Sequence, residues 1–161
     1  MRAWRRIRAR YIGIAAVAPA LVTAIGVGIQ CVWIDELPAQ VATHWSGSGP
    51  DGFGPVWQTV LATAGLGLVL PALLATLIVP SINDGTAGTG KVRFMAATCL
   101  WTSLFIVGLL TYTLWIQRGL SDPAQAPAVG GWPVAIALAA AALSAAAAFA
   151  VPKLETTEDD V

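Results

Sequence analysis

Four long stretches of the chain contain no charged residue, and polar, turn-rich segments separate them. These stretches cover residues 11–34, 57–80, 94–116 and 132–151. A helix needs about 20 apolar residues to cross the hydrocarbon core of a bilayer, and each stretch reaches that length. Backbone polar groups in lipid must be satisfied within the segment, so such spans are helical. The pattern therefore predicts four transmembrane helices, of which the Ala-rich fourth gives the softest signal.

The composition favours a membrane protein over a very apolar soluble helical bundle. The chain is 57% hydrophobic and 11% charged, against about 25% charged in ordinary soluble domains. A soluble domain of 161 residues could not cover its surface with so few charges. The net charge is zero, so no global field draws the protein to nucleic acid. We expect one all-α domain, an integral membrane four-helix bundle whose first partner is the lipid bilayer.

Basic residues are distributed unevenly among the polar segments. Segments 1–10, 81–93 and 152–161 hold eight of the nine, segment 35–56 holds none, and segment 117–131 holds Arg118 alone. Because cytoplasmic loops carry the excess of Lys and Arg, both termini should be cytoplasmic. This predicts a multi-pass plasma-membrane protein with 35–56 and 117–131 outside. The basic start would grip anionic lipid, and the acidic tail 152–161 would be solvated.

Tryptophans mark the same boundary. The proposed anchors at the outer membrane interface are Trp33, Trp57, Trp115 and Trp132. Tryptophan favours the headgroup level, where its ring is buried and its N–H is wet. Pro19 and Pro71 lie within spans and predict local kinks.

The side chains within the spans argue against a transporter or channel. No span contains Asp, Glu, Lys, Arg or His, which an ion path normally needs. Cys31 and Cys99 should lie in opposite leaflets, too far apart for a disulfide. We expect both to be buried small residues.

The polar segment 35–56 has its own internal pattern. Pro38 should end the first helix, after which residues 39–45 run extended or as a short turn. Residues 46–52 include nearly every turn-forming type. Asp51 suits hydrogen bonds from backbone N–H groups, and Gly52 suits a positive φ.

His44 and Asp51 are the one pair suited to a catalytic or metal site. A histidine with a carboxylate can bind zinc or act as a general base, so both are weak metal candidates. One histidine without a cysteine on this side is a thin ligand set. The sequence also lacks a nucleophile triad spacing, a phosphate loop or an HExxH motif. We therefore expect no metal, no cofactor and no enzyme activity. A structural role, in which His44 hydrogen bonds fix the loop while Trp45 and Phe53 enter the interface, is the simpler reading.

The order of residues in this segment carries a family resemblance. The matching residues are Leu37, Pro38, His44, Trp45, Gly49, Pro50, Asp51 and Gly52. In this order, just after a first transmembrane helix, they resemble the signature of the domain-of-unknown-function family numbered 1648. That family includes the SdpI-like small membrane proteins, and the four-span layout fits its small members. Ala42 and Ser46 depart from the usual Pro and Asn, and the closing Lys is absent.

The resemblance implies a bacterial plasma-membrane protein, because the best-known members protect bacteria against a secreted antimicrobial peptide and take part in signalling. The favoured hypothesis is a non-enzymatic binding, immunity or signalling module whose outer loop meets a peptide or another membrane protein. One alternative is an accessory subunit of a larger membrane complex. A second is a metal-dependent membrane enzyme.

Overall fold

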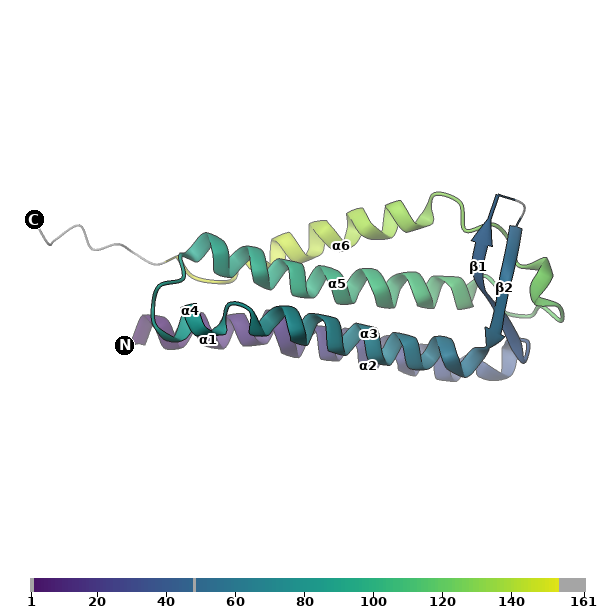
Figure 1. Ribbon diagram of the computed structural model, residues 1–161, viewed down its shortest axis with the longest axis horizontal. Coiled ribbons are helices and arrows are strands. Elements are labelled where there is room, and N and C mark those ends of the chain that lie inside the picture. Colours follow the sequence, from purple (N-terminus) through teal and green to yellow (C-terminus); the bar gives the residue numbers. More distant parts are fainter. Residues whose placement is uncertain (1, 48, 154–161) are drawn as a thin grey trace, which may run out of the picture.

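The chain forms long helices that run side by side, with a two-stranded hairpin across one end (Figure 1). The computed structural model describes residues 2–47 and 49–153. In chain order the elements are α1 (Arg2–Ile12), η1 (Gly13–Val17), α2 (Ala18–Val32), η2 (Ile34–Glu36), β1 (Gln40–Ser46), β2 (Gly49–Pro55), α3 (Val56–Thr76), α4 (Val79–Asn83), α5 (Thr89–Trp115), η3 (Pro123–Gln125) and α6 (Trp132–Ala148). The predicted acidic tail lies outside the described residues from position 154 onward.

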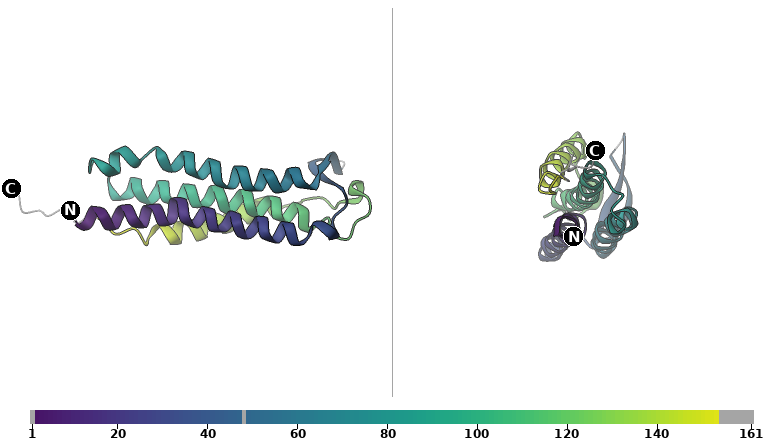
Figure 2. Two further views of the ribbon diagram at one scale, coloured as in Figure 1. Left: turned by 90° about the horizontal axis from the view of Figure 1, so that it is seen from below. Right: turned by 90° about the vertical axis from the view of Figure 1, so that its left-hand side faces the viewer.

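Three helical segments in the described part of the chain are long and apolar enough to cross a membrane. They are Trp4–Val32, Val56–Thr76 and Thr89–Trp115. By length and composition they identify a small membrane protein. The fourth predicted span is shorter, because α6 ends at Ala148 after 17 residues. It runs alongside α5 (Figure 2).

Proline affects the first and second spans differently. The first helix is continuous from the basic segment, but it passes through a π-helical turn at Gly13–Val17, just before Pro19. Pro19 has no N–H to close a regular turn, so the helix widens there. Pro71 lies within α3, which remains one helix. That helix ends at Thr76, short of the predicted end of the span at residue 80, and α4 follows.

Apolar side chains gather where α1, α4 and α5 meet, at the end opposite the hairpin. Ile7, Ile78 and Val92 are fully buried in this cluster. The Tyr11 hydroxyl donates a hydrogen bond to the Ala75 carbonyl at 2.8 Å. Cys99 is buried here as predicted. The prediction for Cys31 is wrong, because Cys31 lies on an exposed face of α2.

Helices α2, α3 and α5 approach closely at glycine. A Cβ added to Gly67 would lie 2.6 Å from Thr23 Oγ1 and 3.1 Å from Val107 Cγ2. A Cβ on Gly26 would overlap Val107 Cγ1. Small residues are how helices pack in lipid, where water does not drive association.

A buried amide connects the same three helices. The Gln30 Nε2 donates to Thr63 Oγ1 at 3.0 Å and to Thr111 Oγ1 at 2.9 Å. Gln30 is fully buried, and within the described residues its Oε1 has no partner. Sequence reasoning considered charged residues in the spans and missed this uncharged polar group.

The expectation of an all-α chain is wrong in the segment between the first two spans. Strands β1 and β2 pair antiparallel there, with Ala42 opposite Phe53 and His44 opposite Gly52. Val41, Thr43 and Trp45 give β1 the β-branched and aromatic residues typical of strands. The glycines and prolines of β2 are depleted in strands, so its sequence predicts only turns.

Candidate functional site

The hairpin is fixed to the end of α5 by a buried glutamine. Gln117 Oε1 accepts the Ala42 N–H at 2.6 Å, and its Nε2 donates to the Ala42 carbonyl at 3.1 Å. The same Nε2 also donates to the Thr113 carbonyl at 2.8 Å. Gln117 thus pairs with Ala42 as a neighbouring strand would. Sequence reasoning missed it, although a glutamine directly after an apolar run was the available signal.

The two polar loops predicted to share one side of the membrane meet at this end of the molecule. Arg118 Nε donates to Glu36 Oε2 at 2.8 Å, and the Gly119 N–H donates to the Glu36 carbonyl at 2.7 Å. The Arg118 guanidinium lies 4.7 Å from the Trp33 ring centroid. The Trp45 Nε1–H donates to the Pro127 carbonyl at 3.2 Å. The hairpin therefore has a fixed base.

His44 and Asp51 form a close pair on this base. His44 Nδ1 lies 2.5 Å from Asp51 Oδ1, while the side chains remain 71% and 44% exposed. The strand register skips Thr43 on β1 and Asp51 on β2. Such bulges redirect side chains, and here they let Asp51 reach back to His44.

Glycine is needed at position 52 for a reason other than the predicted one. Gly52 does not have a positive φ, whereas Gly49 does, at 118°. A Cβ on Gly52 would lie 2.8 Å from the Cβ of His44. The missing side chain therefore makes room for the histidine.

The pair has a defined proton arrangement. The hydrogen bond from His44 is the main cause that holds the pKa of Asp51 below its ordinary value, with a second hydrogen bond from Ser46. An ionised carboxylate only accepts hydrogen bonds, so His44 Nδ1 must carry the shared proton. In the neutral ring, Nε2 is then the acceptor that faces away from Asp51.

Replacing His44 with alanine is expected to raise the pKa of Asp51. The bond favours the ionised carboxylate, so it supports the hairpin above the ordinary aspartate pKa and is lost as pH falls through the lowered pKa. Carbon-13 NMR of the carboxyl groups measures this. Asp84, whose pKa is lowered chiefly by Thr86, should not change and serves as the control. An unchanged Asp51 midpoint would contradict the assigned cause.

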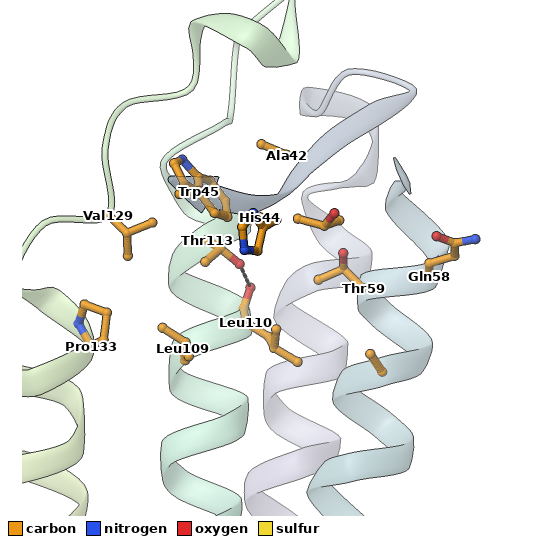
Figure 3. Close-up of a pocket in the computed structure, with 12 residues that line it drawn as sticks. Ala42, His44, Trp45, Gln58, Thr59, Leu109, Leu110, Thr113, Val129 and Pro133 are labelled. Atoms are coloured by element: carbon orange, nitrogen blue, oxygen red, sulfur yellow. Dashed lines mark hydrogen bonds between the residues drawn. The ribbon is translucent and has the colours of Figure 1, made fainter. Parts of the chain in front are cut away.

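A pocket of about 560 Å³ lies beneath the hairpin. Figure 3 shows the His44 ring pointing from β1 toward the pocket. Residues of α3 and α5 line its two sides, and the start of α6 lies next to it. The lining residues are Ala42, Thr43, His44, Trp45, Gln58, Thr59, Ala62, Leu109, Leu110, Thr113, Val129 and Pro133. Its volume lies within the ~300–1,000 Å³ usual for small-molecule sites.

The Thr59 hydroxyl is the most informative polar group in this pocket. Thr59 is 9% exposed, and its hydroxyl has no hydrogen-bond partner among the described residues. Figure 3 shows the hydroxyl on the hairpin side of the side chain. Thr113, by contrast, donates to the Leu110 carbonyl at 2.9 Å. A hydroxyl that faces a pocket and makes no hydrogen bond within the protein is available to a ligand.

The structure brings together part of the predicted site. His44 and Trp45 line the pocket, and Asp51 and Gly52 support His44. Leu37 and Pro38 lead from η2 into β1, and Gly49 and Pro50 begin β2, away from the pocket lining. Trp33, Trp57, Trp115 and Trp132 all lie at helix ends on the hairpin side. Gln58, Thr59 and Thr113 were missed, because single polar residues at span ends are common.

The described residues contain no group of three His, Cys, Asp or Glu side chains that could hold a metal. His44 and Asp51 therefore form a pair without a third side chain of these types that could complete a metal site.

Comparisons with known proteins give one positive result. No curated protein and no solved structure matches the chain. Residues 21–74 match the model of the family described as Domain of unknown function (DUF1648). This segment comprises most of α2, the hairpin and most of α3. The resemblance to that family is thus confirmed over residues 21–74.

Proposed function

We propose that this protein is a non-enzymatic binding module of the bacterial plasma membrane, and that its hairpin receives a ligand at the extracytoplasmic face in immunity or signalling. The main observation in support is the exposed His44–Asp51 pair above a pocket whose lining includes the Thr59 hydroxyl, which makes no hydrogen bond among the described residues.

The rigidity of the hairpin supports binding. Gln117 and the Glu36–Arg118 pair hold its base, whereas the His44 ring is left largely exposed. A histidine that only stabilised the hairpin would gain more from burial among several partners. A side chain held in place and left open is instead suited to a ligand, because less conformational entropy is lost on binding.

The proposed orientation rests on charge. The basic N-terminal helix, Lys91, Arg93 and Lys153 lie at the end of the molecule opposite the hairpin (Figure 1). The positive-inside rule makes that end cytoplasmic, so the hairpin end would face outward.

A photo-crosslinking amino acid at residue 43 tests the proposal in living bacteria. Thr43 is exposed on the pocket rim, so we expect a discrete adduct that disappears when His44→Ala or Asp51→Asn is added. Mass spectrometry of the purified protein identifies the adduct. The same crosslinker at Leu138, exposed on α6, is the matched control and should capture general lipid.

Identical adducts at both positions, or adducts unaffected by His44→Ala, would contradict the proposal. A His44-independent adduct with a larger membrane protein would favour the accessory-subunit alternative. Elemental analysis of the same samples tests the metal-enzyme alternative, which requires stoichiometric metal that His44→Ala removes.

A further inference from the structure

We infer that the pocket beneath the hairpin binds an amphiphile with an ammonium head and one apolar chain, taken from the adjoining membrane leaflet. This inference rests on the proposed function, because it names the ligand class of the same pocket.

The pocket is divided by polarity along the helix axes. On α3, Thr59 lies nearer the hairpin and Ala62 about one turn further away. On α5, Thr113 lies nearer the hairpin and Leu109 about one turn further away. A ligand aligned with the helices would therefore meet polar groups at one end and apolar groups at the other.

The pocket lies at the position along the helices where lipid headgroups are expected to meet the lipid chains. Trp57 lies in the first turn of α3 and Trp132 begins α6, and both side chains are exposed beside the pocket walls. Tryptophan at helix ends marks the headgroup level. The polar half of the pocket would thus lie at the depth of the lipid headgroups, and the apolar half would lie at the depth of the lipid chains.

The polar half offers hydrogen-bond acceptors and no cation. His44 Nε2 and the Thr59 hydroxyl oxygen can both accept, and the lining contains no Lys or Arg. A phosphate or carboxylate head would call for such a cation. An ammonium head supplies three donors and suits these acceptors.

The surroundings add negative charge. The hairpin end of the molecule contains four acidic residues, Asp35, Glu36, Asp51 and Asp122. The basic residue there is Arg118, which is paired with Glu36. The Asp51 carboxylate stands directly behind His44. This field attracts a cationic head and repels an anionic one.

The hairpin edges favour an amphiphile over a peptide added as a strand. The N–H and C=O of Ala42 on the outer edge of β1 are already bonded to Gln117. Strand β2 contains Pro50 and Pro55, which lack the N–H that strand pairing needs.

Dodecylamine, dodecanol and dodecanoic acid test the inference on the full chain in phosphatidylcholine nanodiscs. We expect saturable NMR shifts at His44 and Thr59 with dodecylamine, weaker binding of dodecanol and none of the acid. Thr59→Val should raise the dodecylamine Kd about tenfold, because it removes one hydrogen bond to a charged group. Thr76→Val, near the far end of α3, is the matched control and should leave the Kd unchanged.

A second variant tests the chain half of the pocket without touching the polar groups. Ala62→Leu should fill that half and weaken dodecylamine binding, while the His44 and Thr59 signals stay in place in the free protein. Equal binding of dodecanoic acid, or a Kd that Thr59→Val leaves unchanged, would overturn the inference.

A lysine-rich amphipathic peptide that binds more tightly than dodecylamine and depends on Thr59 would also overturn it. In that case the His44-dependent adduct at residue 43 would remain, so the proposed function would stand. If the protein with His44 intact gave no adduct at residue 43 but still bound dodecylamine, that result would contradict the proposed function alone.

Discussion

Replacing Gly26 with alanine is expected to destabilise the helical bundle by about 1–3 kcal/mol, the usual cost of overpacking a core. The new Cβ would overlap Val107 Cγ1 on α5. Valine in a helix has one strongly preferred χ1, so Val107 cannot rotate away at low cost. The helices α2 and α5 would have to separate. Unfolding by denaturant titration in a fixed detergent measures the change.

Gly28 provides the matched control on the same helix. A Cβ there meets nothing within 4 Å, and alanine is a better helix former than glycine. Gly28→Ala should therefore leave stability unchanged or slightly raised. Adding Val107→Ala to Gly26→Ala should recover part of the loss, because it removes the clashing methyl groups. A Gly26→Ala protein as stable as Gly28→Ala would show that the helices are not in close contact there.

The sequence allowed the long helices to be predicted for a simple physical reason. Lipid tolerates neither charges nor unpaired backbone groups, so an uncharged stretch of sufficient length has few alternatives to a helix. The helix ends were harder to place. The arginines of segment 1–10 do not mark the start of the first helix, which extends back through this basic segment. In the second span, Leu77 and Ile78 interrupt the helix although both are apolar.

The candidate site was predicted only at its most distinctive residues. His44 and Asp51 are the one such pair in their segment, which singles them out in the sequence, and the structure places their side chains in contact. Thr59 could not be selected, because its importance lies in lacking a partner, which depends on the fold. The reason for glycine at position 52 likewise appears only once β1 and β2 are paired.

Replacing Gln117 with leucine is expected to release the hairpin from α5 while the long helices remain. The change leaves the Ala42 N–H and C=O without their partners, each at a cost of about 1–3 kcal/mol if they stay buried. The hairpin should therefore open locally, and hydrogen exchange at the Ala42 amide should accelerate about tenfold or more. Gln125→Leu, at an exposed position of η3, is the control and should leave this exchange unchanged.

A glutamate at position 117 separates the two bonds of Gln117. Its carboxylate can accept the Ala42 N–H but cannot donate to the Ala42 or Thr113 carbonyls. Gln117→Glu should therefore also loosen the hairpin, and it should abolish the His44-dependent adduct at residue 43 as Gln117→Leu does. Normal protection of the Ala42 amide in both variants would mean that another contact fixes the hairpin. Joint loss of protection and adduct would tie ligand capture to the glutamine that positions His44 above the pocket.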